Sequence, residues 1–310
     1  MRLLSVGNMT IDEIVSDSGL NRIVPGGSAF YASVTASIFG AGAAIVSSIG
    51  PDYPQDSLAW MTKKKVNLKG IQTRNSASTR FQLLYKRGNR EVRLLNRGPR
   101  ISNEVQIGNQ DIIHLGPVYH EIDLELAAMA RRKCRFVSLD VQGLIRTAGP
   151  FGRIRLSNKN LGDYLGLCDA VKASREEAKV LTSTIDPIRM ALGLLGKGPK
   201  FALVTLGSNG VVVGSKDGIL KVPAYPETRQ FDSTGAGDVM LAGWLVAFWR
   251  TRDIAWASAV GSAFASLIVR HSGMAKFRIS RRELFRRASW IYPRVLVVQE
   301  RRGYRATPSI

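Results

Sequence analysis

The chain carries Phe231-Asp232-Ser233-Thr234-Gly235-Ala236-Gly237-Asp238 directly before the apolar run Val239 to Trp249, and this stretch decides how it folds. Three small residues precede a carboxylate, and a hydrophobic run of helix length follows. If Gly235, Ala236 and Gly237 open that helix, their unpaired backbone N–H groups and the positive end of the helix dipole form an anion site. The carboxylate of Asp238 then stands beside a site for negative charge.

Two interpretations fit this spacing. In a phosphoryl transferase, the N–H groups hold charge on the moving phosphoryl group, and the carboxylate accepts the proton of the acceptor hydroxyl. In the alternative, the segment is a glycine-rich turn, and Asp238 is an acidic residue in the first turn of a helix. The residues of this segment alone leave both open.

A resemblance to a known family favours the first interpretation. Asp232-Ser233-Thr234-Gly235-Ala236-Gly237-Asp238 resembles the D-T-x-G-A-G-D signature of the ribokinase/PfkB carbohydrate kinases. A second match lies near the N-terminus, where Gly26-Gly27 opens Ser28-Ala29-Phe30-Tyr31-Ala32 and leads to Gly50-Pro51-Asp52. Both signatures stand in the family's order, and the resemblance covers nearly the whole chain. It implies an enzyme that phosphorylates a hydroxyl of a small polyol or sugar with ATP.

Length and composition agree with a globular enzyme. The 310 residues, 45% of them hydrophobic, are enough for a substantial core, and we expect a single kinase domain over 1–310. Cys134 and Cys168 offer neither a disulfide framework nor metal-ligand spacing, which indicates reduced thiols in a cytoplasmic protein. Met1 to Gly7 is typical of a strand rather than a signal peptide, and Val239 to Trp249 is too short to cross a bilayer.

The net charge is unusual. Forty-four basic and twenty-four acidic side chains leave +20, which favours contact with anions, and arginines concentrate near the C-terminus. A nucleic-acid surface and a solvated basic face both fit this pattern. No zinc finger, RNP motif or basic–aromatic alternation supports the first, so we expect nucleic acid not to be a partner. A basic binding protein on a kinase-like scaffold remains an alternative function.

Strand-like and helix-like segments alternate along the chain. Buried apolar strands separated by helices predict a layered α/β fold with a parallel sheet. The resemblance implies the ribokinase-like version, three α/β/α layers with a mostly parallel central sheet and a small β lid. The expected strands are Leu3 to Val6, Ala43 to Ile49, Phe136 to Leu139, Ala170-Val171 and Phe201 to Thr205, and the expected helices are Gly27 to Phe39 and two long ones from Ala236 and from Asp253.

A segment with alternating residues, unlike the apolar strands of the central sheet, predicts the lid. Alternating residues over Arg80 to Leu95 flank Arg87-Gly88-Asn89-Arg90 and indicate a hairpin. Short β segments at Ile14-Val15 and Arg22 to Val24 would join it, giving lid elements near 12–25 and 80–97. The resemblance implies that these strands cover the sugar. The lid is smaller than that of ribokinase, so dimerisation through lid strands is doubtful, and we expect a monomer or a homodimer.

On the acceptor side, the resemblance implies the following roles. Asp238 is the catalytic base, and Gly235, Ala236 and Gly237 form the anion hole. Asp12 follows the first strand at its carboxyl end, where open α/β sheets bind ligands, and the equivalent acid of the family binds sugar hydroxyls. A loop aspartate that caps a turn would also explain Asp12. The further candidates for substrate contact are Asn8 and the glycines Gly26 and Gly27, which would let the substrate approach the backbone or form a helix-start turn.

On the nucleotide side, Thr205-Leu206-Gly207-Ser208-Asn209-Gly210 matches the family's T-x-G-x-x-G segment. The resemblance therefore implies that Thr205, Gly207 and Gly210 lie near ATP. His271 and Gly273 fall where the family encloses the adenine, although a lone histidine is more often structural. Lys172 would reach a nucleotide phosphate or end a strand as a solvated lysine.

The metal-linked positions contain a departure from the family. Its common N-x-x-E motif, tied to magnesium and phosphate, is Ser174-Arg175-Glu176-Glu177 here, with Ser in place of Asn. Ser-x-x-Glu is also a capping box, which needs no metal. Glu177 is our candidate for Mg²⁺, bound through water. Asp232 and Thr234 match positions that bind a monovalent cation in some relatives, so K⁺ activation is a further expectation.

Two stretches narrow the acceptor. Asp140-Val141-Gln142-Gly143-Leu144-Ile145-Arg146 resembles the D-x-Q-x-L-I-R stretch of plant myo-inositol kinases, and Lys172-Ala173-Ser174 with Glu176-Glu177-Ala178 resembles their K-A-S-x-E-E-A. The favoured acceptor is therefore myo-inositol. Gln142 and Arg146 either lie near this acceptor or brace the neighbouring loop. Nucleoside kinase and ribokinase-type or ketohexose kinase activities are the alternatives.

Overall fold

A ten-stranded sheet forms the centre of the computed structural model, which describes residues 1–15, 21–86, 89–103, 105, 107–157, 161–228, 232–271, 274 and 279–300. The strands are β1 (Arg2–Val6), β4 (Gly42–Ile49), β5 (Val66–Thr73), β8 (Gln110–Leu115), β9 (Cys134–Asp140), β12 (Ala170–Ser174), β13 (Phe201–Thr205), β14 (Val211–Ser215), β15 (Gly218–Val222) and β16 (Leu296–Glu300). Their order is β16-β15-β14-β13-β12-β9-β8-β1-β4-β5. From β5 to β13 neighbours are parallel, whereas β14, β15 and β16 extend the sheet antiparallel.

Helices cover both faces of this sheet, which confirms the predicted three-layer α/β/α fold. Alternate strand residues point to opposite faces, so Leu3 joins the core beneath α8, and Leu4 joins the core beneath α3. The first face carries α1 (Ser28–Ile38), α2 (Gln55–Lys63), α8 (Ala236–Thr251), α9 (Ile254–Ile268) and α10 (Arg281–Ile291), and the second carries α3 (Leu124–Lys133), α5 (Gly162–Gly166), α6 (Arg175–Thr182) and α7 (Pro187–Leu195). Shorter helical segments are α4 (Gln142–Ile145), η1 (Pro150–Gly152), η2 (Gly207–Asn209) and η4 (Tyr292–Arg294).

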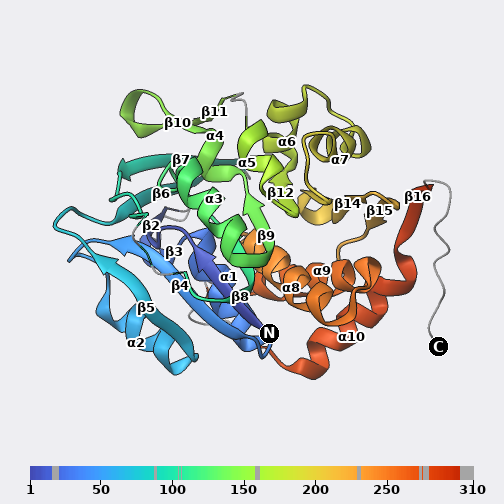
Figure 1. Ribbon diagram of the computed structural model, residues 1–310, viewed down its shortest axis with the longest axis horizontal. Coiled ribbons are helices and arrows are strands. Elements are labelled where there is room, and N and C mark those ends of the chain that lie inside the picture. Colours follow the sequence, from blue (N-terminus) through green and yellow to red (C-terminus); the bar gives the residue numbers. More distant parts are fainter. Residues whose placement is uncertain are drawn as a thin grey trace.

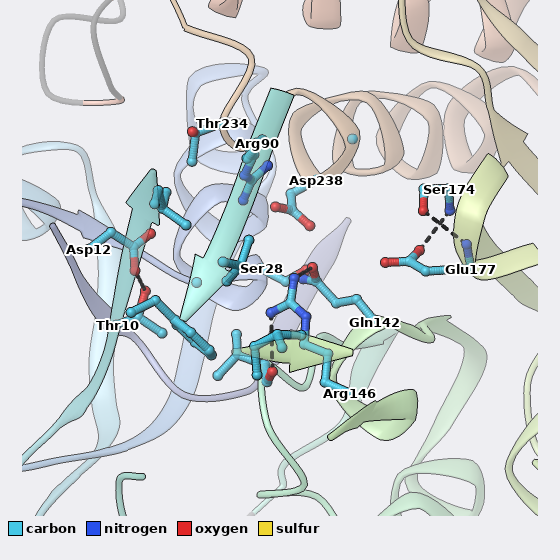
Figure 2. A pocket seen from close by; sticks show the side chains of 18 of the residues that line it. Thr10, Asp12, Ser28, Arg90, Gln142, Arg146, Ser174, Glu177, Thr234 and Asp238 are labelled. Atoms are coloured by element: carbon cyan, nitrogen blue, oxygen red, sulfur yellow. Dashed lines mark hydrogen bonds between the residues drawn. The ribbon is translucent and has the colours of Figure 1, made fainter. Parts of the chain in front are cut away.

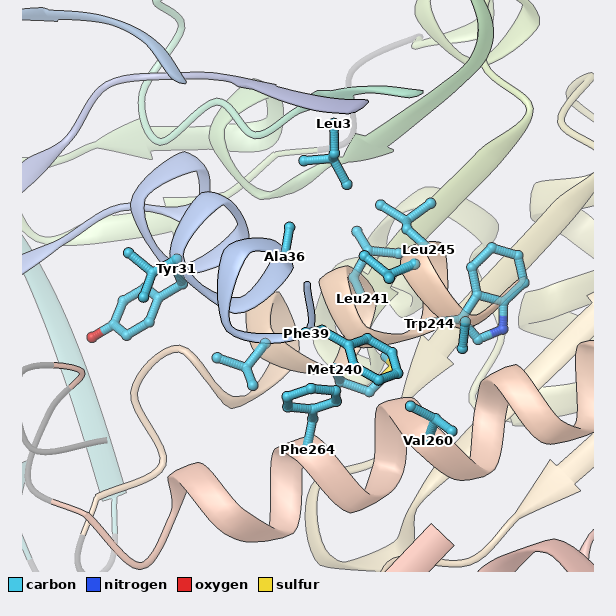
Figure 3. Packing of buried hydrophobic residues seen from close by; sticks show 14 of the residues in the cluster. Leu3, Tyr31, Ala36, Phe39, Met240, Leu241, Trp244, Leu245, Val260 and Phe264 are labelled. Atoms are coloured by element: carbon cyan, nitrogen blue, oxygen red, sulfur yellow. The ribbon is translucent and has the colours of Figure 1, made fainter. Parts of the chain in front are cut away.

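The long apolar run of the sequence is the core helix α8. Leu241 and Leu245 of α8 lie toward Leu3 of the sheet, and Phe264 of α9 packs nearby (Figure 3). Trp244 is fully buried, and its indole N–H donates to Ser258 Oγ at 3.1 Å. Because α8 is covered by the sheet on one side and by α9 on the other, it is apolar nearly all round. Within the described residues, every helix is too short or too polar to cross a membrane.

The lid is a separate four-stranded sheet, with the order β3-β2-β6-β7. Its strands are β2 (Thr10–Val15), β3 (Asn21–Gly26), β6 (Thr79–Lys86) and β7 (Asn89–Asn96). The predicted hairpin is β6–β7, whose turn residues 87 and 88 lie outside the described residues. Buried Ile14, Phe81, Leu83 and Val118 hold the lid together. In Figure 1 its strands lie at the opposite end of the molecule from α9 and α10, and the small hairpin of β10 (Arg146–Ala148) and β11 (Ile154–Leu156) lies near β7.

Candidate active site

A cavity of about 500 Å³ lies between the lid and the carboxyl ends of the parallel strands. This is the position that the fold favours for a ligand. Asp238 lies between Asp12 on one side and Glu177 on the other (Figure 2). The predicted site residues in its walls are Asp12, Gly27, Gln142, Arg146, Lys172, Glu177, Thr205, Thr234, Gly235, Gly237 and Asp238.

The predicted anion hole stands at the first turn of α8. Gly235 is the N-cap with φ 76°, and a Cβ there would lie 2.5 Å from the ring of Tyr31, so only glycine fits. The amides of Gly237 and Asp238 belong to the first turn and have no intrahelical partner. Ala236 departs from the prediction, because its N–H donates to the carbonyl of Ser233 at 3.2 Å. The Ala236 amide is therefore occupied within the loop, and the amides of Gly237 and Asp238 remain for the predicted anion hole.

Asp238 has the surroundings of a base. Its Oδ1 is buried and has no hydrogen-bond partner within the described part of the chain, and the side chain lines the cavity. Burial raises the pKa of Asp238 to about 7, helped by the nearby carboxylate of Asp140 and opposed by Lys172 and by a hydrogen bond from Ser28. A carboxyl with a pKa near neutrality is well matched to accept a proton from a hydroxyl.

A buried ion pair lies next to Asp238. Lys172 Nζ lies 2.8 Å from Asp140 Oδ2, and both side chains are almost completely buried. Burial lowers the pKa of Lys172, but the carboxylates of Asp140, Glu177 and Asp238 outweigh it and keep the ammonium charged. Lys172 Nζ also lies 3.1 Å from the position a Cβ would take on Gly237. The charge of Lys172 therefore adjoins the predicted anion hole, a position that fits the predicted contact with a phosphate.

Ser28 connects Asp238 to a buried histidine. Ser28 Oγ lies 3.2 Å from His114 Nε2, and His114 Nδ1 lies 3.1 Å from Ser138 Oγ. Burial lowers the pKa of His114 to about 4, so the ring is neutral at physiological pH. The Ser28 hydroxyl, which hydrogen-bonds to Asp238, is thus held by the uncharged ring of His114.

Asp12 forms the opposite wall, on lid strand β2. Thr10 Oγ1 donates to Asp12 Oδ1 at 2.7 Å, and burial raises the pKa of Asp12 to about 6 against the opposing effects of Thr10, Arg90 and Arg146. Gly26 lies behind this carboxylate rather than in the cavity wall. A Cβ on Gly26 would come within 2.1 Å of Asp12 Oδ2, so this glycine makes room for Asp12.

Asn8 is also placed differently from the prediction. Its amide donates to the carbonyl of Pro99 at 2.7 Å, and its Oδ1 accepts from the N–H of Ser48 at 3.1 Å. These bonds fasten neighbouring loops, and Asn8 does not line the cavity. Gly27 does line it, as predicted for a backbone that a substrate approaches.

For Gln142 and Arg146 the sequence left two roles open, a place near the acceptor and bracing of the neighbouring loop, and the contacts of both residues fit both roles. They line the cavity, and they brace each other through a 2.8 Å hydrogen bond from Arg146 Nη2 to Gln142 Oε1. Arg146 also donates to the carbonyl of Val118 at 3.2 Å and lies over the ring of Phe81. The guanidinium is therefore held in one orientation at the cavity wall.

Several side chains in or just behind these walls were not among the residues predicted from the sequence. Tyr31 lines the cavity with a buried hydroxyl that has no hydrogen-bond partner, close to the charges of Asp12 and Asp238. Arg90 reaches the cavity from β7, whereas Asp140 ends β9 and lies behind the wall, paired with Lys172. Only Asp140 had a recoverable signal, because it ends a buried parallel strand at the ligand-binding edge.

On the nucleotide side, Thr205 lines the cavity at the end of β13. Gly207 opens η2 and is exposed, with open space around it. Gly210 is buried instead, and a Cβ there would lie 2.0 Å from the carbonyl oxygen of Val222, so it serves the chain turn. His271 is partly buried outside the cavity walls, and Gly273 lies outside the described residues.

Glu177 forms the capping box that its spacing predicts. Its Oε2 accepts from the N–H of Ser174 at 2.7 Å, and Ser174 Oγ accepts from the N–H of Glu177. The bond uses one carboxylate oxygen, and the side chain still lines the cavity. The described residues contain no group of three or more His, Cys, Asp or Glu side chains placed to hold a metal ion. Glu177 fits Mg²⁺ that keeps its waters and rests mainly on phosphate oxygens.

Known proteins are similar to this chain in sequence or in fold. The cytidine kinase of Thermococcus kodakarensis is 25% identical over 259 residues, which cover 81% of this chain and 90% of that protein. Inositol 3-kinase of Arabidopsis thaliana is 26% identical over 288 residues, covering 89% of this chain and 76% of that protein. A solved pyrophosphate-dependent kinase of the ribokinase family, complexed with a pyrophosphate analogue and myo-inositol, has a TM-score of 0.79 at 22% identity over 92% of this chain and 99% of its own.

The family itself follows from a match that spans most of the chain. The model of the pfkB family of carbohydrate kinases matches residues 6–279, a range that includes the lid, Asp12 and the first turn of α8. Members transfer a phosphoryl group to an alcohol, and kinases of this family use ATP, typically with Mg²⁺. The chain belongs to the pfkB family of carbohydrate kinases and is a phosphotransferase with a sugar or cyclitol hydroxyl as acceptor.

Proposed function

We propose that this enzyme phosphorylates one hydroxyl of a small polyol, with myo-inositol as the favoured acceptor and Mg·ATP as the donor. One observation carries the proposal. Asp238 presents a buried oxygen without a partner at the wall of a cavity that it shares with the first turn of α8 and with Asp12. A base, an anion hole and a carboxylate for hydroxyl groups thus face one space.

In the proposed reaction, the acceptor hydroxyl loses its proton to the Asp238 carboxylate as its oxygen bonds to the γ-phosphorus of ATP. The bond from that phosphorus to the β–γ bridging oxygen breaks, and ADP leaves. The amides of Gly237 and Asp238 and the ammonium of Lys172 are placed to hold the negative charge on the phosphoryl group in transit. Their positive potential is fixed before the reaction begins, so little reorganisation is needed.

Magnesium has a defined place in this proposal. When bound with the donor, Mg²⁺ neutralises part of the charge on the donor phosphates. Glu177 would hold it through water, on the side of the cavity away from Asp12. The capping bond to the N–H of Ser174 keeps the Glu177 carboxylate in one orientation for this contact.

The polar lining supports a cyclitol acceptor. Asp12, Tyr31, Gln142 and Arg146 offer several hydrogen-bonding groups for a ring that carries many hydroxyls. The likeness to the Arabidopsis inositol 3-kinase and the D-x-Q-x-L-I-R stretch add to this support. A nucleoside is the second candidate acceptor, because the Thermococcus relative is a cytidine kinase. Ribose and ketohexoses follow.

The test is a panel of acceptors and donors. Phosphorylated product would be measured with myo-inositol, ribose, fructose, 2-keto-3-deoxygluconate, adenosine, cytidine and no acceptor, each with Mg·ATP and with pyrophosphate. We expect turnover with myo-inositol and ATP well above every other combination. Turnover with a nucleoside or another sugar would contradict myo-inositol as the acceptor but leave the role of Asp238 intact. Turnover with pyrophosphate and none with ATP would contradict ATP as the donor.

Nucleic acid is not among the partners we propose. The basic C-terminal region contains Arg287, which is buried and holds Glu227 and Glu283 at 2.9 Å and 2.8 Å, so part of the excess charge serves the core. Silence across the whole panel, together with duplex binding that falls steeply with salt, would favour a binding protein instead.

We also propose a cytoplasmic enzyme that is a monomer or a homodimer. The free thiols Cys134 and Cys168 support a reducing compartment. Sedimentation analysis of the purified protein would decide the oligomeric state, and a particle larger than a dimer would contradict it.

A further inference from the structure

Two lid residues hold the loop that leads into the anion hole. Tyr85 of β6 lies with its hydroxyl 2.8 Å from Thr234 Oγ1 and 3.4 Å from Asp232 Oδ1. Arg22 of β3 brings Nη2 to 3.7 Å from Asp232 Oδ2, and the Asp232 side chain is 3% exposed. The bound loop, Asp232 to Thr234, runs directly into Gly235. The lid is therefore fastened to the segment that positions the phosphate-binding turn.

Asp232 and Thr234 are the residues from which the sequence predicted a monovalent cation site, and their surroundings do not fit one. Asp232 Oδ1 already accepts from the N–H of Thr234 at 2.9 Å and faces the Tyr85 hydroxyl. Among the described residues, Oδ2 accepts no hydrogen bond and faces the guanidinium of Arg22, whose buried Nε likewise has no partner there. A cation on Oδ2 would stand beside this fixed positive charge, and the two would repel each other.

We infer that Arg22 and Tyr85 are positioning residues that take the place of a monovalent cation, so that phosphotransfer by this enzyme does not depend on K⁺. Arg22 supplies the positive charge that Asp232 needs, and Tyr85 fixes the side chain of Thr234. The expected effect on turnover rests on the proposed function, whereas the expected effect on stability rests only on the contacts of Arg22 and Tyr85.

The same contacts link the acceptor to the phosphate side. Asp12 and Arg22 lie on the paired strands β2 and β3, where Asp12 is opposite Val24 and Ile14 is opposite Arg22. An acceptor that binds Asp12 thereby orders the sheet that carries Arg22. The sheet that covers the cavity therefore also holds the loop before α8, and a covered cavity favours phosphotransfer to the acceptor over transfer to water.

The first experiment compares cations at equal ionic strength. Turnover would be measured in sodium, potassium and tetramethylammonium chloride for the natural enzyme, for Arg22→Met and for Arg80→Met. Arg80 is a matched control, because it lies on the lid with a side-chain exposure of 31%, close to the 29% of Arg22, and pairs with Glu13. We expect equal rates in all salts for the natural enzyme and for Arg80→Met.

Arg22→Met should behave differently. Its turnover in tetramethylammonium should fall about 10-fold, and K⁺ should restore part of it by neutralising the Asp232 carboxylate, which this variant leaves without a counter-ion. Activation of the natural enzyme by K⁺, or unchanged turnover in Arg22→Met, would overturn the inference. Tyr85→Phe keeps the charge of Arg22, so it should lose turnover without gaining a response to K⁺, and a response to K⁺ in this variant would contradict the assignment.

A second readout does not depend on activity. The midpoint of thermal unfolding would be measured for the same proteins in the three salts. We expect K⁺ to raise the midpoint only for Arg22→Met, because only this variant leaves Asp232 without its counter-ion. A specific K⁺ effect on the natural protein would overturn the inference even if no acceptor were ever phosphorylated. If Arg22→Met does not fold, the natural protein and Tyr85→Phe decide the question.

Discussion

The two sides of the cavity hold their carboxylates in opposite ways. On the acceptor side, Asp12 Oδ1 accepts a 2.7 Å hydrogen bond from Thr10, its neighbour on the same strand. On the phosphate side, Ser28 of another element holds the Asp238 carboxylate, and Asp238 Oδ1 is buried with no hydrogen-bond partner among the described residues. A carboxylate that binds hydroxyl groups benefits from a fixed orientation, whereas one that takes a proton needs an oxygen left open. The difference supports the proposal that Asp12 binds the acceptor and Asp238 takes its proton.

The surrounding charges differ as well. On the phosphate side, the Lys172–Asp140 pair is buried, with exposures of 7% and 0%. On the lid, the Arg80–Glu13 pair has exposures of 31% and 28%. Breaking a buried pair leaves an uncompensated charge, but breaking an exposed one changes little. Substitutions on the phosphate side should therefore have the larger effects.

Lys172→Met should have the largest combined effect on stability and turnover. It removes the cation beside the anion hole and leaves Asp140 and Asp238 facing each other. We expect turnover to fall about 10²–10³-fold and the free energy of unfolding to drop by about 3 kcal/mol. Turnover and urea denaturation would be measured together.

The matched control for Lys172 is Lys200→Met, since Lys200 also pairs with an aspartate at 2.8 Å but is 71% exposed. Its loss should change stability by less than about 1 kcal/mol and leave turnover intact. Equal effects of the two substitutions would show that burial of the pair is not what matters.

Asp12→Asn should act on binding. The amide keeps the shape of the side chain but cannot accept as strongly from acceptor hydroxyls. We expect KM for the acceptor to rise about 10–100-fold, with a smaller change in kcat. Glu13→Gln, on the same strand but paired with Arg80, is the control and should leave KM unchanged. A loss confined to kcat in Asp12→Asn would assign Asp12 to the chemical step and remove the distinction between the two sides.

Asp140→Asn should move the pH dependence. The charge of Asp140 raises the pKa of Asp238, whereas Lys172 lowers it, so the substitution should lower that pKa. In the natural enzyme, kcat/KM should fall as the pH drops through about 7, and in the variant this fall should come about one pH unit lower. Asp169→Asn removes a buried aspartate outside the cavity and should leave the profile in place. An unchanged profile in Asp140→Asn would separate Asp140 from the base.

The smallest effect concerns stability. The folded pKa of Asp238, about 7, lies above the usual value, so the folded protein holds a proton that the unfolded chain releases. Stability contributed by this group is present below about pH 4 and is lost as the pH rises to about 7. Asp238→Asn cannot lose that proton. It should therefore be about 1–2 kcal/mol more stable than the natural protein in urea near pH 8, and nearly equal near pH 4. Equal stability at both values would contradict the raised pKa.

Much of the phosphate side could be predicted because its residues are contiguous. Gly235, Gly237 and Asp238 belong to one helix start, and a helix start has the same geometry wherever it occurs. Asp12 could be predicted from its place after a strand, and the strands and long helices from their apolar patterns. The antiparallel extension β14 to β16 was not anticipated, because its pairing depends on distant segments.

What the sequence could not provide are contacts between distant elements. Arg22 and Tyr85 gain their roles from partners in the loop before α8, and no local pattern marks them. A strand end marks Asp140, but its pairing with Lys172 depends on a second strand. Contacts between distant elements also explain why some residues predicted to bind the substrate have a structural role in the fold. Gly26 makes room for Asp12, and Asn8 fastens loops. That residues 1–310 form a single kinase domain stays a prediction.

The most direct test is the turnover of Asp238→Asn beside that of Asp186→Asn, an exposed N-cap aspartate of α7 where asparagine caps equally well. Phosphorylated acceptor would be measured with Mg·ATP and the best acceptor of the panel, and folding would be checked by thermal unfolding. We expect Asp186→Asn to match the natural enzyme and Asp238→Asn to lose about 10²–10⁴-fold in turnover while folding normally. A folded Asp238→Asn enzyme with nearly natural turnover would contradict the assignment of Asp238 as the base.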